Sequence, residues 1–322
     1  MIKAILFHVI LVVLIIIGSI IFTPKSNEKG FGVDYVTSNK IFSETKDTVD
    51  VIALGDSLVY SSLSPMLIYE QYGYTTYAAS TPAQSIYESY DILKRIYKTQ
   101  HPQYVFFEAE SLFRKINFEE DIQNRYGVKI PLILFHNRWK NLSRKDFSTR
   151  FTLSKKDDLK GFRYYDNVVP LVKHKKPSIH LQPYALSYLK KIMKLTQTYH
   201  TKLIFMSLPS AKNWSKERNK TLSQYFKAQG YDFIDFNTLP LNINWNTDSR
   251  DGGDHLNYNG AKKASLYFGQ YLFGQCDLVD HRGDARYANY EQALILYQQR
   301  IKQRENKNKS SKRAFVFMPN YA

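Results

Sequence analysis

The longest apolar stretch of the chain lies near its N-terminal end. Residues 4–22 carry no charged side chain, and a helix of this length spans roughly 28 Å, close to the thickness of a bilayer's hydrocarbon core. A cleaved signal peptide is the alternative, but its apolar region is usually shorter and ends at a cleavage site of small residues. This stretch runs instead into Thr23 and Pro24. The pattern predicts one uncleaved N-terminal transmembrane helix, with residues 1–23 as the membrane anchor.

Short apolar runs alternate with helical periodicity in the rest of the chain. Four runs are typical of buried strands, at residues 51–54, 104–107, 203–206 and 231–234. Apolar side chains at helical spacing predict helices over residues 62–72, 85–98, 184–199, 215–229, 259–273 and 288–304. Strands that alternate with helices in this way favour a parallel sheet with helices on both faces. The predicted fold is therefore α/β, a three-layer α/β/α sandwich around a parallel sheet.

Polar and irregular segments divide the chain around that core. Residues 24–48 are polar, with proline and glycine, and predict a stalk that leads off the membrane. We place the folded domain at residues 49–278, with a basic, aromatic-rich insertion at about 114–176. Residues 279–322 are predicted to form a C-terminal helix followed by a mobile basic tail.

Composition narrows the classes of partner. The 322 residues include 45 lysines and arginines against 29 acidic residues, a formal net charge of +16, which favours an anionic neighbour. A membrane anchor and buried strands argue against nucleic acid. We expect two partners instead: the lipid bilayer, contacted through residues 4–22, and an anionic cell-surface glycopolymer.

Metal and cofactor chemistry has little support in the sequence. Cys276 is the one cysteine, which excludes a disulfide framework and a cysteine-based zinc site. His174, His180 and His200 lack the spacing of metal ligands, and no glycine-rich phosphate loop is present. We expect neither a metal nor a cofactor.

Two short polar segments carry the candidate chemistry. Gly55-Asp56-Ser57 directly follows the first predicted strand, and Asp251-Gly-Gly-Asp254-His255 precedes the last helix of the domain. A serine nucleophile needs a base within hydrogen-bonding reach, and the base needs an orienting acid. Parallel strands collect their carboxyl ends at one edge, where ligands bind, so the fold can bring Ser57 and His255 together. Taken singly, Gly-Asp-Ser is more often a helix N-cap, and an Asp-His pair in a glycine-rich loop is more often a solvated turn.

In combination the two segments resemble the SGNH/GDSL hydrolase superfamily. Leu54-Gly-Asp-Ser-Leu58 matches the block that carries the nucleophilic serine, and Asp254-His-Leu-Asn-Tyr-Asn-Gly260 matches the block that carries the acid and the histidine. The resemblance covers residues 50–275 in order. It implies Ser57 as the nucleophile and His255 as the base.

One branch of that superfamily is similar in layout. The spans Ser80 to Tyr90, His136 to Trp139 and Asp248 to His255 look like membrane-anchored, extracytoplasmic members. These include the D-alanyl transfer protein of teichoic-acid operons and alginate O-acetylation proteins, which work beside a membrane-bound O-acyltransferase. The resemblance implies such a partner. One apolar stretch of this length predicts a single-pass cell-membrane protein, and action on envelope polymers would put its large domain on the extracytoplasmic side. A lone cysteine without a disulfide suits a bacterial surface.

The chain departs from the superfamily pattern at the acid. The usual acid lies three residues before the histidine, where this chain has Gly252. Asp251 and Asp254 are the candidates, with Asp248 a more distant third. We favour Asp251, because a side chain adjacent to His255 usually points elsewhere.

The oxyanion hole departs from the pattern as well. Ser80 to Gln84 stands where the second block would be, and Glu108 and Glu110 stand in place of a Gly-x-Asn block. The donors would then be the Ser57 backbone N–H and the Gln84 side chain, with Ser80 beside it; a helix-start role for Gln84 is the alternative. We interpret the two glutamates as a solvated strand end.

Arg138 and Trp139 are candidate acceptor-binding residues in the insertion. An aromatic ring stacks on the apolar face of a sugar, and a guanidinium binds an anion. The alternative is an aromatic anchor that packs the insertion onto the core.

These observations support three functional hypotheses. The first is an extracytoplasmic serine O-acyltransferase that moves an acetyl or similar acyl group onto a cell-surface polysaccharide or teichoic-acid-type polymer through acyl-Ser57. With water as the acceptor, the same triad gives a surface carbohydrate esterase. The third is a non-catalytic scaffold that binds polymer or a membrane acyltransferase.

Overall fold

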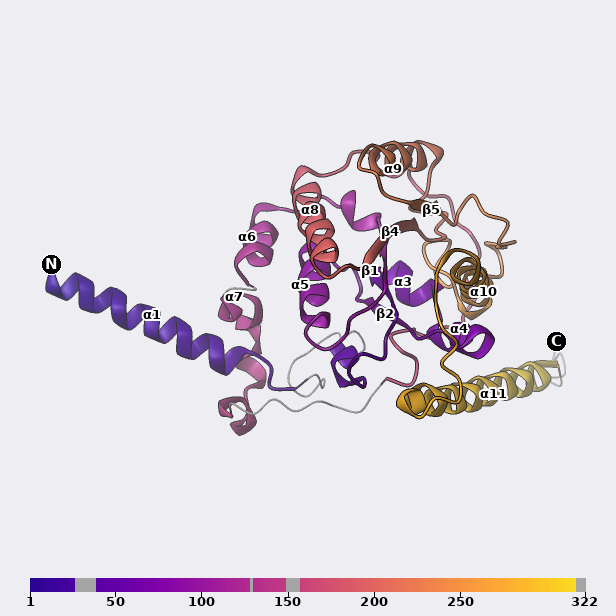
Figure 1. Cartoon of the computed structure of the whole chain (residues 1–322), viewed down its shortest axis with the longest axis horizontal. Helices are drawn as coiled ribbons and strands as arrows, with labels where there is room; N and C mark the ends of the chain where they lie inside the picture. Colours follow the sequence, from indigo (N-terminus) through magenta and orange to yellow (C-terminus); the bar gives the residue numbers. More distant parts are fainter. Residues whose placement is uncertain (27–38, 128–129, 149–156, 317–322) are drawn as a thin grey trace, which may run out of the picture.

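A parallel sheet forms the centre of the protein (Figure 1). The computed structural model describes residues 1–26, 39–127, 130–148 and 157–316. The strands are β1 (Val51–Gly55), β2 (Thr76–Ser80), β3 (Tyr104–Glu108), β4 (Lys202–Ser207) and β5 (Phe233–Asp235). They are all parallel and lie in the order β2-β1-β3-β4-β5. The predicted α/β fold with a parallel sheet is confirmed.

Helices cover both faces of the sheet, which confirms the three layers. One face packs against α5 (Ile86–Ile96), α8 (Pro183–Thr198) and α9 (Lys216–Ala228), and the other against α3 (Ser57–Ser62), α4 (Pro65–Tyr72) and α10 (Tyr258–Gln275). Alternate strand residues enter the two cores: Ile52 and Leu54 face α5, whereas Val51 and Ala53 face α3. Strands that are buried on both faces have continuous apolar sequences. For this reason the short apolar runs identified them.

Three elements of this region differ from the sequence prediction. The helix predicted over residues 62–72 begins only at Pro65, because proline disfavours helical backbone in the residue before it. The short helix α3 was not predicted. Strand β2 was not predicted, because Ala78, Ala79 and Ser80 have little of the β-branched or aromatic character that marks a strand.

The outer edge of β2 is covered rather than open. The Ala78 N–H donates to the Lys160 carbonyl at 2.9 Å, and at Gly161 a Cβ would lie 2.0 Å from the Ala78 oxygen. The Lys160 ammonium is buried and binds both oxygens of Glu44 at 2.9 Å. This contact blocks further strand pairing at the edge.

The insertion is partly helical. It contains α6 (Phe118–Gly127), α7 (Pro131–Phe135) and the short 3-10 turns η4 (His136–Asn141) and η5 (Arg144–Phe147). Further 3-10 turns are η2 (Lys40–Ser43), η3 (Glu110–Leu112) and η6 (Ala285–Tyr287). Helix α11 (Ala288–Val316) continues past the predicted residue 304, so most of the expected tail is helix. Stalk residues 27–38 and tail residues 317–322 lie outside the described residues.

Helix α1 (Ile2–Phe22) projects away from the domain (Figure 1). Its mean hydropathy reaches 3.2 and none of its apolar window is buried in the protein. Within the described parts of the chain it is the one helix long and apolar enough to cross a membrane. By length and composition it equally suits a signal sequence.

Candidate active site

The candidate residues gather where the chain order of the sheet reverses. Strand β1 lies between β2 and β3, so the chain moves to one side of β1 to form β2 and to the other side to form β3. Crevices at such points, beyond the carboxyl ends of the strands, are where open α/β sheets bind ligands. Ser57 follows β1 and Glu108 ends β3, so both lie at this edge.

The turn after β1 presents Ser57. Strand β1 is buried and ends at Gly55, where a Cβ would lie 2.6 Å from the Glu108 Cβ, so only glycine fits. Asp56 caps α3 by accepting a hydrogen bond from the Leu58 N–H at 3.0 Å. Ser57 is the first helical residue, and its N–H therefore has no acceptor within the helix.

A tight loop before α10 carries His255. Gly252 and Gly253 turn the chain with φ of +83° and +106°, a region that favours glycine. The turn brings Asp251 back to His255, whose N–H donates to Asp251 Oδ1 at 2.8 Å. Asn257 then caps α10 with its side chain. A turn of two glycines thus places the acid four residues before the histidine.

The structure joins Asp251, His255 and Ser57 in a continuous hydrogen-bonded relay. Asp251 Oδ2 lies 2.6 Å from His255 Nδ1, and His255 Nε2 lies 2.7 Å from Ser57 Oγ. A carboxylate only accepts, so Nδ1 carries the proton and Nε2 accepts from the serine hydroxyl. Partial burial opposes ionisation of Asp251, but the hydrogen bonds from His255 outweigh it and lower the pKa of Asp251.

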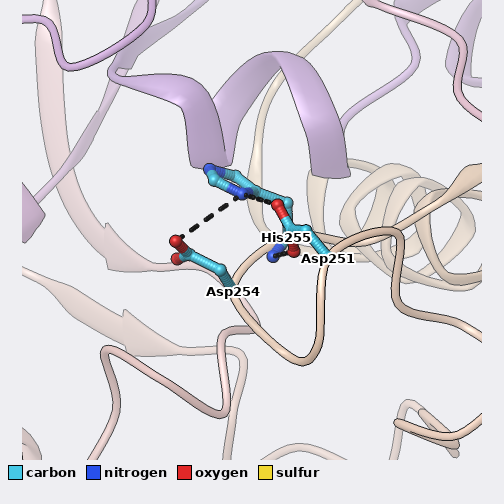
Figure 2. Close-up of side chains that lie close together, drawn as sticks. All are labelled: Asp251, Asp254 and His255. Atoms are coloured by element: carbon cyan, nitrogen blue, oxygen red, sulfur yellow. Dashed lines mark hydrogen bonds and ion pairs between the residues drawn. The ribbon is translucent and has the colours of Figure 1, made fainter. Parts of the chain in front are cut away.

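Asp254 is oriented differently. Its carboxylate lies 3.9 Å from His255 Nδ1 and is held by Lys212 Nζ at 2.5 Å and Asn213 Nδ2 at 2.7 Å. Figure 2 shows His255 between the two carboxylates, with the shorter contact to Asp251. The geometry for orienting the imidazole therefore belongs to Asp251.

Asp248, the third acid, stabilises the loop instead. It is buried, and its carboxylate accepts from Lys263 Nζ of α10 at 2.6 Å and from the Asn244 N–H at 2.8 Å. These contacts join the loop to the helix that follows it.

The same carboxylates form a group that has the composition of a metal site. One ligand atom each of Asp251, Asp254 and His255 lie within 4.8 Å of one another. Asp251 already accepts from His255 through both oxygens, and Asp254 accepts from Lys212 and an amide. A cation here would have to displace the Lys212 ammonium, so the arrangement suits proton transfer better than metal binding.

Gln84 does not reach the relay. Its side chain is buried and donates to Ser89 Oγ at 3.0 Å and to the Ala79 carbonyl at 3.5 Å, while Thr81 donates to its Oε1. The amide thus holds the loop after β2, because both its nitrogen and its oxygen are engaged within that loop. The oxyanion role expected for this side chain is not supported.

Ser80 lies beside the end of β1. It ends β2 in register with Gly55, two residues before Ser57. Its hydroxyl is buried and, within the described parts of the chain, has no hydrogen-bond partner. Its predicted place beside the oxyanion remains a prediction.

A layer of acidic groups lies under the nucleophile. Glu108 is 1% exposed, so the interpretation as a solvated strand end is wrong for it. Burial, with the charges of Asp56 and Glu110, raises the pKa of Glu108 well above its usual range. Burial likewise raises the pKa of Glu110 to about 7, although Arg218 pairs with it. Burial and the neighbouring carboxylates therefore favour the protonated form of Glu108.

Sequence reasoning missed the cations of the site. Lys212 holds Asp254, and Arg114 lies 3.3 Å from the Asp56 carboxylate. Arg250 lies 3.6 Å from Asp251. Lys212 follows β4 at the same edge of the sheet, and that position was a usable signal. For the two arginines, neither spacing nor a motif pointed to the site.

Arg138 and Trp139 lie elsewhere. The Arg138 guanidinium is buried and donates to the Asp146 carboxylate and to the Phe22 carbonyl at the end of α1. Trp139 is 63% exposed. In Figure 1, α7 and α1 lie on the left of the view, whereas α3 and α10 lie on the right. These contacts give the predicted acceptor role no support, because Arg138 instead joins the insertion to the end of α1.

Comparison with known proteins found no matching family model and no matching curated protein. Three solved structures illustrate a remote likeness. A family 3 carbohydrate esterase from Clostridium thermocellum is 12% identical, with a TM-score of 0.39, over 71% of this chain and 96% of the other. The esterase EstA from Pseudoalteromonas sp. is 14% identical, with a TM-score of 0.38, over 71% and 96%. A GDSL-like lipase from Bacteroides thetaiotaomicron is 12% identical, with a TM-score of 0.36, over 70% and 87%. At such distances, conclusions about chemistry must rest on this chain's own residues.

Proposed function

We propose that this chain is a serine enzyme that acts on esters through an acyl-Ser57 intermediate. The observation that carries the proposal is the relay from Asp251 through His255 to Ser57, with contacts of 2.6 and 2.7 Å. The three residues come from a strand-end turn and a distant loop, which meet at the ligand-binding edge of a parallel sheet.

The first half-reaction follows from the protonation states of the relay. His255 Nε2 takes the Ser57 proton as Oγ attacks the ester carbonyl carbon, and Asp251 stabilises the imidazolium. The Ser57 N–H, which has no acceptor within α3, would donate to the oxyanion. When the tetrahedral intermediate collapses, the bond to the leaving alkoxide breaks and His255 returns the proton to that oxygen. The acyl group remains on Ser57.

The second half-reaction sets the biological product. An acceptor hydroxyl gives its proton to His255 and attacks the acyl carbon, and Ser57 Oγ leaves and recovers the proton. We propose a sugar or polyol hydroxyl of a surface polymer as the acceptor, which makes the enzyme an O-acyltransferase. Ester hydrolysis is the second candidate, favoured by the Asp251 side chain, which is 37% exposed at the site.

We further propose that α1 anchors the domain on the extracytoplasmic side of a bacterial cell membrane. The juxtamembrane segment, residues 130–148, packs against the last turns of α1, where the Leu132 N–H donates to Ser19 Oγ at 3.4 Å. Trp139 and Phe147 of this segment are 63% and 67% exposed. Exposed aromatic rings beside cationic residues are typical of membrane interfaces. A membrane-bound O-acyltransferase would then supply the acyl group.

Covalent labelling tests the nucleophile. The full chain in non-ionic detergent is treated with a fluorophosphonate, and the modified residue is located by mass spectrometry. We expect labelling at Ser57 that disappears in Ser57→Ala and His255→Ala but persists in Ser223→Ala, which removes an exposed serine of α9. A folded protein that is not labelled, or is labelled equally in Ser57→Ala, would contradict the proposal and favour a scaffold.

Product analysis separates the transferase from the esterase. With 4-nitrophenyl acetate as donor, acetate is followed in the presence of poly(glycerol phosphate) or polygalacturonate. Acetate recovered on the polymer supports acyl transfer. Acetate recovered only in solution supports the esterase.

A further inference from the structure

A groove runs directly beside the loop that carries His255. It encloses about 520 Å³ between residues 171–177 on one side and residues 211–217 on the other. We call it the lysine groove. None of the motifs that led to the relay points to it, because its two walls are far apart in the sequence.

Both walls are bonded to the His255 loop. From the first wall, the Val172 N–H donates to the Gly252 carbonyl at 3.1 Å, and His174 Nε2 donates to the same carbonyl at 2.7 Å. From the second wall, the Lys212 N–H donates to the Gly253 carbonyl at 3.1 Å. A molecule in the groove therefore lies beside the Gly252-Gly253 turn of the loop, and Lys212 connects the second wall to Asp254 next to His255.

The groove carries an excess of positive charge, although Glu217 interacts with Lys176 and Lys216. Lys173, Lys175, Lys176 and Lys216 are exposed along it, and none of them forms an ion pair within the described residues. Glu217 is the one acidic residue among those that line it. Four lysines against one carboxylate leave a net attraction for anions.

The groove also has a flat apolar surface. Trp214 lines it, and the indole Nε1 donates to Asp235 Oδ2 at 2.7 Å, which fixes the ring. Leu171, Val172 and Pro177 add apolar wall. A fixed aromatic ring next to point charges suits a ligand with an apolar sugar or polyol face and anionic groups.

We propose that the lysine groove binds the anionic acceptor polymer, a glycopolymer whose repeat carries phosphate or carboxylate. This inference rests on the proposed function and deepens it. Residues 173–176, if extended, span roughly 10 Å, more than one phosphate occupies, so the groove fits several charges of a chain. In Figure 1, α9, whose first residues line the groove, lies at the top of the view and away from α1, which argues against the bilayer surface as the occupant.

The groove would present a polymer hydroxyl to acyl-Ser57. The ester bond to Ser57 Oγ breaks as the bond from the polymer oxygen to the acyl carbon forms. The hydroxyl proton passes through His255 Nε2 to Ser57 Oγ. No further reactant is required.

Direct binding tests the groove without turnover. We compare the full chain in non-ionic detergent with Lys173→Gln/Lys175→Gln/Lys176→Gln, using fluorescently labelled poly(glycerol phosphate) and polygalacturonate. We expect the triple variant to weaken the Kd for at least one polymer tenfold or more, with a reduced salt dependence. The matched control is Lys190→Gln/Lys191→Gln/Lys194→Gln on α8, which removes the same charge from exposed positions elsewhere and should change the Kd less than twofold. Thermal unfolding verifies that both triples fold.

Three outcomes would overturn the proposal for the groove. The two triple variants could weaken polymer binding equally, or the unmodified chain could bind neither polymer. The third outcome is that single-stranded DNA of matched charge binds as tightly as the polymers. Ser57→Ala should bind polymer normally. Loss of the proposed enzyme activity would therefore leave the binding result intact, and the two failures are distinguishable.

Discussion

Asp251→Asn is the substitution that tests the relay most directly. Both Asp251 oxygens accept from His255, one from its backbone N–H and one from Nδ1. An asparagine cannot accept at both positions. If its amide nitrogen faces Nδ1, the imidazole proton moves to Nε2, where it can no longer accept from Ser57.

The expected magnitude follows from the lost charge. A carboxylate and an imidazolium about 4 Å apart attract by about 4 kcal/mol at an effective dielectric of about 20, and that attraction exists only while His255 holds the serine proton. Its loss corresponds to about a thousandfold in rate. Asp254 is farther from Nδ1, at 3.9 Å, and is neutralised by Lys212. We therefore expect Asp254→Asn to lower the rate less than tenfold.

The assay is kcat/KM for 4-nitrophenyl acetate, with the full chain in detergent near pH 8. Thermal unfolding of both variants verifies that the loop still folds. The reasoning is refuted if folded Asp251→Asn keeps more than a tenth of the unmodified rate. An equal or larger loss in Asp254→Asn would refute it as well, because the orienting acid would then be Asp254.

Two further predictions concern the residues under the nucleophile. Gly55→Ala should destabilise the fold by about 1–3 kcal/mol, because its Cβ would lie 2.6 Å from the Glu108 Cβ; an unchanged midpoint in chemical denaturation would contradict this. For Glu110, burial raises the pKa to about 7 from an ordinary 4.5, so the folded state binds a proton that the unfolded state has lost, and stability falls as pH rises from 4.5 to 7. Relative to Glu110→Gln, which does not titrate, the unmodified protein should lose about 2 kcal/mol of unfolding free energy between pH 5 and 7.5, and parallel pH profiles would show that Glu110 titrates normally.

The pattern of apolar residues predicted the layers. Strands buried on both faces have continuous apolar runs, and helices have apolar residues at helical spacing. The pattern located β1, β3 and β4 for this reason, and the apolar faces of α5 and α8. The pattern did not reveal β2. Its alanines and serine have a low preference for strands, and pairing with β1 holds them in the sheet.

In the candidate site, too, some residues could be identified from the sequence and others only from the structure. Ser57 and His255 were identifiable because each follows or precedes a recognisable element in a short segment. The structure shows other hydrogen-bond partners for Gln84 and Arg138 than their expected roles require, because neither the partners nor the burial of a side chain can be read from residue type. The burial of Glu108 was missed for the same reason.

By itself, the sequence determined the apolar N-terminal helix and the parallel α/β class and singled out Ser57 and His255 as candidates, because these depend on local patterning. The tertiary structure decided which acid orients His255, since a turn through Gly252 and Gly253 sets the distances to Asp251 and Asp254. It also brought the two lysine-bearing walls together beside the loop. Such features depend on contacts between segments distant in the chain, and no local preference encodes them.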